Sequence, residues 1–285
     1  MSNDRASAET ILITGGTGKT GRRLAKRLTS HGVPVRIGSR SADIPFDWED
    51  RSTWDGALDG VSAAYLSYYP DLALPGAAET VEAFALRALE KGVRRLVLLS
   101  GRGEEGAEKA EKLLEATGAD WTVLRAAWFA QNFSENYMID GILEGELVLP
   151  VGDVGEPFID ADDIADIAFA CFTEPGHIGT LYELTGPRLL TFAEAVGEIA
   201  AATGRDIRFR RVTIDEFVAA LHEQQVPQPF IDLMIELFTQ VLDGRNERLA
   251  DGVQRALGRA PRDFADYVRR TAASGVWDAQ APAAS

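Results

Sequence analysis

Short apolar runs alternate with amphipathic stretches through the first half of the chain. The stretches between these runs carry apolar residues at helical spacing, and glycines at 32, 92 and 118 stand where a helix would give way to a strand. This alternation predicts parallel βαβ units, and therefore an α/β fold built on a doubly wound parallel sheet of the Rossmann type. The expected strands are residues 10–13, 33–38, 63–66, 93–100 and 121–125, and the expected helices include 75–91 and 107–117.

The pattern changes after Arg125, where residues 126–136 are aromatic and irregular. Further short strands are expected at 146–151, 157–159, 182–184 and 207–212, a helix at 162–172 capped by Asp160 or Asp162, and mostly helices over 191–273. We therefore expect a Rossmann NAD(P)-binding domain over residues 1–155. The last sheet elements and a smaller, mainly helical substrate-binding lobe should occupy 156–273, and a flexible tail 274–285.

A glycine-rich stretch lies between the first predicted strand and the first predicted helix. It reads Thr14-Gly15-Gly16-Thr17-Gly18-Lys19-Thr20-Gly21. In a dinucleotide site, Gly15 permits the tight turn, Gly18 lets the backbone approach a pyrophosphate, and Gly21 lets the helix pack closely. Thr14, Thr17, Lys19 and Thr20 are the other candidate cofactor contacts in the stretch. A nucleotide triphosphate loop would need a glycine where Ile13 stands, so the dinucleotide interpretation is preferred.

The end of the second predicted strand bears on which nicotinamide cofactor binds. An NAD site usually has an acidic residue there, but this chain has Ser39 and Arg40, which suit a 2′-phosphate. NADP is therefore the expected cofactor, with NAD as the alternative if Arg40 is only a solvated charge. Asp47 could accept a hydrogen bond from the adenine amino group, or it could simply stabilise a turn.

Ligands of doubly wound sheets bind beyond the carboxyl ends of the strands, where the strand order reverses. We expect that reversal between the first and fourth predicted strands. Ser100 and Gly101, at the end of the fourth strand, should then lie near the reactive end of the cofactor. Ser67 and Tyr68, at the end of the third, should line the cofactor groove. Ser100 could equally be an ordinary strand-end residue, and Tyr68 an ordinary turn aromatic.

Composition narrows the function further. The 285 residues carry a formal net charge of -15, which argues against nucleic acid and against an anionic membrane surface as partners. The single cysteine, Cys171, excludes an internal disulfide, and no apolar run is long enough to span a bilayer. The histidines have no partners at ligand spacing, so no metal site is expected. A cytoplasmic monomer or homodimer that binds a small molecule is the expectation.

Several motifs together resemble the NmrA-like group of atypical short-chain dehydrogenase/reductases. They are the glycine stretch, 93–100, Trp121-Thr122-Val123-Leu124-Arg125, Trp128-Phe129-Ala130-Gln131-Asn132-Phe133, 158–165 and 182–187. The resemblance runs from Ile11 to about Tyr267. It is strongest to festuclavine/agroclavine dehydrogenase-like and NAD(P)H:quinone oxidoreductase-like members. It implies a protein that binds NAD(P) and either reduces small molecules or senses redox state.

One departure from the wider family affects the chemistry. Most short-chain dehydrogenases use a Tyr-x-x-x-Lys pair after the fourth strand, but no tyrosine lies between Ser100 and Trp121. We therefore expect an NADPH-dependent reductase of a small apolar iminium, quinone or enone, which takes any proton it needs from water. The alternative is a non-catalytic NAD(P)-sensing regulator. The candidate catalytic residues are Ser100 and Asn132, and the expected pocket residues are Trp128, Phe129, Asn132, Phe133 and Tyr137.

Overall fold

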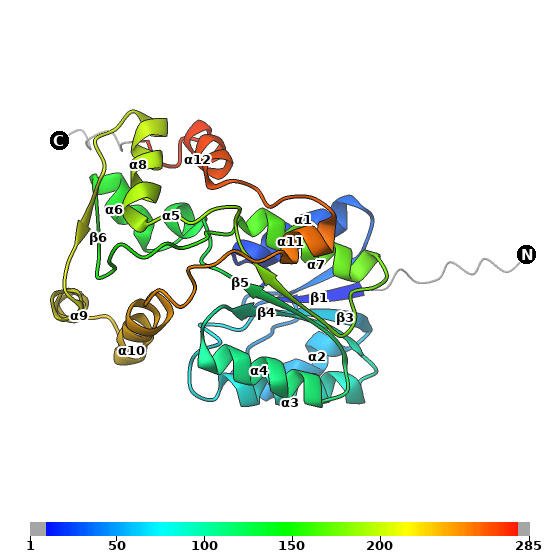
Figure 1. Cartoon of the computed structure of the whole chain (residues 1–285). Helices are drawn as coiled ribbons and strands as arrows, with labels where there is room; N and C mark the ends of the chain where they lie inside the picture. Colours follow the sequence, from blue (N-terminus) through cyan, green and yellow to red (C-terminus); the bar gives the residue numbers. More distant parts are fainter. Residues whose placement is uncertain (1–9, 279–285) are drawn as a thin grey trace, which may run out of the picture.

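A six-stranded parallel sheet forms the centre of the molecule. The computed structural model describes residues 10–278, and Figure 1 shows the sheet with helices on both faces. Every neighbouring pair of strands in this sheet is parallel, which confirms the predicted fold class. The strands, in their order across the sheet, are β2 (Val35–Gly38), β1 (Thr10–Thr14), β3 (Val61–Leu66), β4 (Arg95–Gly101), β5 (Asp120–Ala126) and β7 (Thr180–Leu184).

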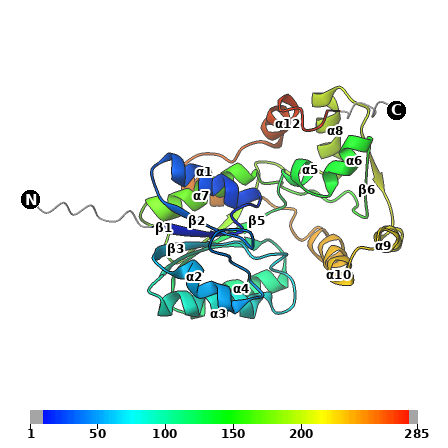
Figure 2. The same ribbon diagram turned by 180° about the vertical axis from the view of Figure 1, so that it is seen from behind.

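Two separate apolar cores cover the two faces of this sheet. Leu24 and Leu28 of α1 (Lys19–Ser30) pack with α7 (Ala161–Thr173) on one face. On the other face lie α2 (Trp54–Leu58), α3 (Ala77–Glu90) and α4 (Glu105–Ala116), with Phe84 of α3 fully buried. Figures 1 and 2 show these two layers from opposite sides. Burial on both faces explains why the central strands are continuous apolar runs.

The strand order corrects one prediction. We expected the order to reverse between the first and fourth predicted strands, but the neighbour of β1 is β3. The physical reason lies in burial: β3 is buried along almost its whole length and needs an interior position, whereas β2 is only half-buried and can form an edge. The reversal therefore falls between β1 and β3, so the cofactor crevice should open there.

The smaller lobe is built around an aromatic core. It contains α5 (Asn132–Glu135), α6 (Met138–Glu144), α8 (Phe192–Thr203), α9 (Ile214–Glu223), α10 (Gln228–Glu236), which continues into a π-helical turn (Leu237–Val241), and α12 (Phe264–Ala273). A parallel pair of strands, β6 (Glu146–Leu149) and β8 (Arg208–Arg211), lies beside them. Phe133, Phe158 and Phe192 pack together at the centre. No helix within residues 10–278 combines the length and apolarity needed to cross a bilayer.

The chain crosses between the sheet and the lobe more often than predicted. A single boundary at residue 155 is too simple, because α5, α6 and β6 precede it yet build the lobe. After it, α7, β7 and α11 (Gly252–Leu257) complete the sheet layer, in the range where the last sheet elements were expected. The predicted flexible tail is also docked at its start: Trp277 is fully buried and its indole donates to the Phe133 carbonyl at 2.9 Å. Residues 279–285 lie outside the described part of the chain.

Candidate functional site

The glycine stretch forms a tight turn that only glycine accommodates. Gly15 has φ +62°, in the left-handed region, and its carbonyl accepts the Gly18 N–H at 2.9 Å. A Cβ on Gly21 would lie 2.3 Å from the Gly15 carbonyl oxygen, so any larger residue would push α1 away from the turn. These close approaches match the roles that the sequence predicts for Gly15 and Gly21.

The N-terminus of α1 is open to an anion. No side chain caps it, and Thr17 and Gly18 are exposed, so its first N–H groups remain available. Lys19 is half-buried in the first turn, and burial lowers the pKa of its ammonium, an effect that Glu135 partly offsets. This combination of free N–H groups and a nearby cation fits a dinucleotide pyrophosphate.

Two threonines of the stretch hold the turn in place through their hydroxyls. Thr14 Oγ1 donates to the Tyr65 carbonyl at 3.0 Å and accepts the Ser67 N–H at 2.9 Å, which ties β1 to β3. Thr20 Oγ1 accepts the Tyr65 hydroxyl at 3.0 Å. Both side chains are buried, and their hydroxyls bond to protein groups of β3 and of the residue that follows it.

Ser67 lies directly at the crevice between β1 and β3. A Cβ on Gly15 would lie 3.2 Å from the Ser67 side chain, so these two residues face each other at the strand ends. Tyr68 turns the other way: its ring centroid is 5.1 Å from that of Trp48, and it packs against the core beneath α3. Ser67 therefore faces the glycine turn, as predicted for a groove residue, whereas the Tyr68 ring packs against Trp48 and the core.

Arg40 extends from the end of β2 toward the loop after β3. Its guanidinium lies 5.4 Å from the centre of the Tyr69 ring, in cation–π geometry across the end of β1. Both side chains are exposed, and Arg40 makes no ion pair with another described residue. Asp47 accepts the Glu49 N–H at 3.1 Å, which is the turn-forming role left open by the sequence. The sequence had placed Tyr69 at the end of the third predicted strand, as a candidate for the cofactor groove or an ordinary turn aromatic, but not as a partner of Arg40.

Ser100 is buried, and its hydroxyl already donates a hydrogen bond to a neighbouring side chain. Ser100 Oγ donates to Glu111 Oε1 at 2.5 Å, and the Arg125 guanidinium donates to the same oxygen at 2.9 Å. This network ties β4 and β5 to α4. Gly101 lies at the crevice edge beneath the Glu104 carboxyl, because a Cβ on Gly101 would fall 2.1 Å from that group.

Carboxyl groups from separate elements gather beyond the ends of β3 and β4. Burial raises the pKa of the Glu104 carboxyl well above its ordinary value, and neighbouring negative charge on Asp71 and Glu236 raises it further. Burial also raises the pKa of Asp71. Burial, and then Asp71, raise the pKa of Glu236 in α10. Burial and mutual repulsion thus disfavour full ionisation of this acidic group (Asp71, Glu104 and Glu236), and a positive charge bound beside it would favour the ionised forms.

The predicted pocket aromatics do not share one wall. Trp128 is half-buried, and its ring lies 5.6 Å from Phe192 and 5.7 Å from Phe238 between centroids. Phe133 is fully buried in the lobe core, where it cannot line an open pocket. The interpretation of Phe133 as a pocket residue is therefore corrected: the aromatic spacing that suggested a pocket serves core packing.

The remaining predicted pocket residues point to different parts of the molecule. Phe129 packs on the core that covers the α1 face of the sheet, and Tyr137 is 40% exposed at the start of α6. The half-buried Asn132 side chain makes no hydrogen bond with another described residue, so its amide is available to a ligand. Trp128 and Asn132 are thus the predicted residues best placed to meet a substrate.

Glu156 is a residue of this region that the sequence did not reveal. Its side chain is 1% exposed, and Oε1 accepts the Trp128 N–H at 3.1 Å. Oε2 has no hydrogen-bond partner among the described residues. The segment before Pro157 is irregular and shows no periodicity, so only the folded chain brings this carboxyl beside Trp128.

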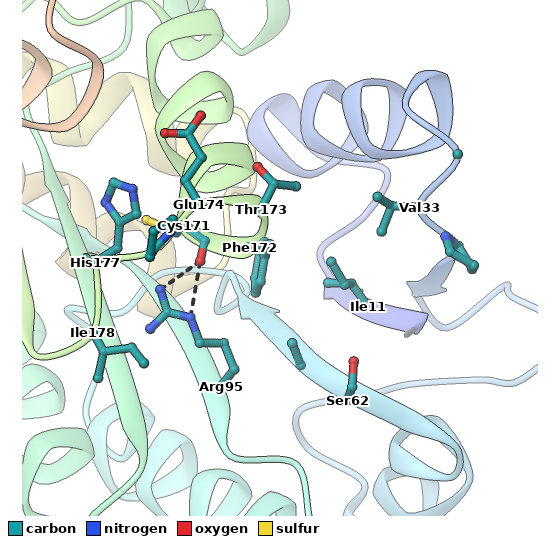
Figure 3. A pocket seen from close by; sticks show the side chains of 15 residues that line it. Ile11, Val33, Ser62, Arg95, Cys171, Phe172, Thr173, Glu174, His177 and Ile178 are labelled. Atoms are coloured by element: carbon teal, nitrogen blue, oxygen red, sulfur yellow. Dashed lines mark hydrogen bonds between the residues drawn. The ribbon is translucent and has the colours of Figure 1, made fainter. Parts of the chain in front are cut away.

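The cavity shown in Figure 3 lies at the opposite end of the strands from the glycine turn, where β1, β3 and β4 begin. It has a volume of about 510 Å³ and is lined by Ile11, Ser62 and Arg95, near the starts of β1, β3 and β4, and by the chain that follows α7. Arg95 donates to the Cys171 carbonyl at 2.7 and 3.2 Å, which caps the C-terminal end of α7. This cavity is therefore separate from the crevice that the glycine turn forms.

Comparison with known proteins agrees with this geometry. No protein-family model matches the chain. Agroclavine dehydrogenase of Claviceps fusiformis is 34% identical over 280 residues, which cover 91% of this chain and 96% of that protein. A quinone oxidoreductase of Escherichia coli, solved with NADPH, shares the fold with TM-score 0.72 at 20% identity, covering 91% of this chain and 99% of that one.

The negative transcriptional regulator NmrA also shares the fold, with TM-score 0.68 at 15% identity, covering 94% of this chain and 98% of that one. The solved structures thus match the doubly wound sheet and the lobe together. The glycine turn, the open N-terminus of α1 and the sequence identity to a dehydrogenase lead to one conclusion. The chain belongs to the NmrA-like group of atypical short-chain dehydrogenase/reductases and is an NAD(P)H-dependent oxidoreductase.

Proposed function

We propose that this protein is an NADPH-dependent reductase of a small, largely apolar electrophile. The observation that carries the proposal is that a dinucleotide-binding turn and the Trp128 aromatic wall lie beyond the same carboxyl ends of the sheet. Gly15, Gly18 and Lys19 would hold the pyrophosphate, and Arg40 the 2′-phosphate. Bound NADPH supplies a hydride, while the protein binds, orients and shields the acceptor.

An iminium ion, a quinone or an enone is the acceptor class that this site suits. Reduction of a simple ketone develops an alkoxide, which needs a general acid worth about 10²–10⁴ in rate. The chain lacks the tyrosine relay that supplies this acid in related enzymes. A positively charged acceptor bound beside Asp71, Glu104 and Glu236 would favour their ionised forms, which burial and mutual repulsion otherwise disfavour. The free amide of Asn132 is better placed than Ser100 to orient the acceptor, because the Ser100 hydroxyl is donated to Glu111.

The test is turnover of NADPH with matched acceptors. The loss of NADPH absorbance would be followed with four acceptors: an N-methyl dihydroisoquinolinium ion, menadione, benzalacetone and acetophenone. We expect oxidation with at least one of the first three and little with acetophenone. Tight NADPH binding without turnover of any acceptor would instead support the cofactor-sensing alternative. Efficient acetophenone reduction would extend the acceptor class to simple ketones and contradict the preference for iminium and conjugated acceptors.

A further inference from the structure

Glu156 is a buried acid with an unsatisfied oxygen. Its backbone pairs with Leu190 through hydrogen bonds of 2.9 and 3.0 Å, so the position of the residue is well determined. Oε1 accepts the Trp128 N–H, whereas Oε2 is the only buried side-chain oxygen or nitrogen without a partner within residues 10–278. Buried polar groups without a partner are rare in native proteins and often mark a functional site.

The surroundings of Glu156 keep a proton on this carboxyl. Burial raises its pKa to about 7, which outweighs the opposing effects of the Trp128 N–H and of Arg102. Arg102 is engaged elsewhere, since its guanidinium pairs with Glu183 and donates to the Asn246 and Arg248 carbonyls. The other nearby carboxylate, Glu247, accepts the Gly155 N–H at 2.6 Å. Near neutral pH the side chain therefore offers an O–H donor that no protein acceptor uses.

Glu156 is linked to the chain that follows the carboxyl ends of the strands, where the cofactor crevice is expected. Trp128, its hydrogen-bond partner, follows the end of β5 by two residues. Arg102 follows the end of β4 directly. Because the sheet is parallel, the carboxyl ends of β4 and β5 lie on the same side as the glycine turn after β1. Trp128 forms the proposed aromatic wall on that side. Glu156 is therefore a buried carboxyl bonded to the backbone of the proposed aromatic wall, in a chain that lacks the tyrosine relay as a proton donor.

We propose that Glu156 is the proton donor of the reductase site and delivers the Oε2 proton to the oxygen of a conjugated carbonyl substrate. This inference rests on the proposed function and adds the source of the proton. For an enone, hydride from the reduced nicotinamide forms a C–H bond at the β-carbon, and the conjugated π electrons move to the carbonyl oxygen. The Oε2–H bond breaks as the substrate O–H bond forms, and a solvent proton then restores the carboxyl. An iminium ion needs no such proton, because hydride addition leaves a neutral amine.

A contrast between acceptors tests this role. Glu156→Gln keeps an oxygen for the Trp128 N–H but cannot donate an acidic proton. We expect it to lower the single-turnover rate with benzalacetone by about 10²–10⁴ and to leave the rate with the dihydroisoquinolinium ion nearly unchanged. Glu247→Gln is the matched control, since that exposed carboxylate also accepts a backbone N–H from the adjacent segment. It should leave both rates unchanged.

A second measurement does not depend on turnover. The infrared difference spectrum between the wild type and Glu156→Gln should show the C=O band of a protonated carboxyl below about pH 7, and this band should fade above that pH. The wild-type benzalacetone rate should fall over the same pH range. Equal losses with both acceptors, an unchanged benzalacetone rate, or a carboxyl already ionised at pH 5.5 would overturn the assignment. A wild type that turns over no acceptor would instead refute the proposed function itself.

Discussion

Single side chains of the site are held in two contrasting ways. Arg40 is exposed, and its one described partner is the ring of Tyr69, so its charge remains free for a ligand. Glu156 is enclosed, and burial determines its protonation. An exposed cation binds an anion by charge attraction. In a buried acid, the free-energy cost of ionisation raises the pKa and keeps the carboxyl protonated. The two residues therefore call for different experiments.

Arg40→Ala should separate the two nicotinamide cofactors. A hydrogen bond from arginine to a phosphate contributes about 1.5–3 kcal/mol, which corresponds to a loss of about 10- to 150-fold in NADPH affinity. NADH affinity should stay nearly the same, because NADH lacks the 2′-phosphate. Isothermal titration with both cofactors measures the difference. Equal losses for NADPH and NADH would reject Arg40 as the 2′-phosphate ligand.

Glu156→Gln should stabilise the protein at high pH and have little effect at low pH. Below about pH 4.5 the carboxyl is protonated in both the folded and the unfolded chain. Between about pH 4.5 and 7 only the unfolded chain releases the proton, so the wild type loses stability as pH rises. The loss reaches about 3 kcal/mol and then stays constant. Urea unfolding of wild type and variant at pH 4.5 and pH 8 measures it, and an equal difference at the two pH values would contradict the raised pKa.

At the scale of elements, backbone contacts position the cofactor turn. The Gly15 carbonyl accepts the Gly18 N–H, and α1 approaches this turn so closely that Gly21 has no room for a side chain. The acidic residues before α7 serve the helix in a similar way: Asp160 caps its N-terminus by accepting the Asp162 N–H at 2.9 Å. The capping expectation is thus confirmed for Asp160. Ordinary helix-end chemistry accounts for a cluster that could have suggested a metal site.

Gly21→Ala tests the close packing of α1 on the turn. The added Cβ would meet the Gly15 carbonyl oxygen at 2.3 Å, so α1 must shift, and we expect a loss of about 1–3 kcal/mol in stability together with weaker NADPH binding. Gly197→Ala is the matched control, because Gly197 lies inside α8 with no atom within 4 Å of the added Cβ. That change should stabilise the protein by about 0.5–1 kcal/mol. Thermal unfolding compares the two, and a stable Gly21→Ala variant with full NADPH affinity would refute the packing role.

At the scale of the whole molecule, Trp128 joins the sheet layer to the lobe. It follows β5, packs on Phe192 and Phe238 of the lobe, and contacts a small cluster that includes Leu74 after β3 and Leu237 after α10. The same residue holds Glu156 through its backbone N–H. The substrate site that we propose would therefore be bounded by both parts of the molecule, whereas the glycine turn belongs to the sheet layer alone.

Trp128→Ala should therefore affect turnover much more than cofactor binding. Loss of the ring removes a wall that aligns the acceptor, and misplacement by about 1 Å can cost about 100-fold in rate. NADPH affinity should stay close to that of the wild type, since the glycine turn and Arg40 do not contact Trp128. Steady-state turnover and NADPH titration on the same preparation give the comparison. Weaker NADPH binding with unchanged turnover would mean that the substrate site is misplaced.

The sequence by itself determined the alternating elements, the glycine turn and the family. These features are local: apolar periodicity, helix caps and a tight turn depend on residues close together in the chain. Arg40 was singled out in the same way, from its place at the end of the second predicted strand, and its role as the 2′-phosphate ligand stays a prediction.

Only the tertiary structure decided the neighbour of β1, the burial of Phe133 and the partners of Ser100 and Glu156. Strand order depends on which strands need burial on both faces, a property of the assembled sheet. The pairs Ser100–Glu111 and Trp128–Glu156 join side chains or backbone groups from different elements. The pKa of Glu156 arises from the burial that these contacts create, so no local pattern in the sequence could reveal it.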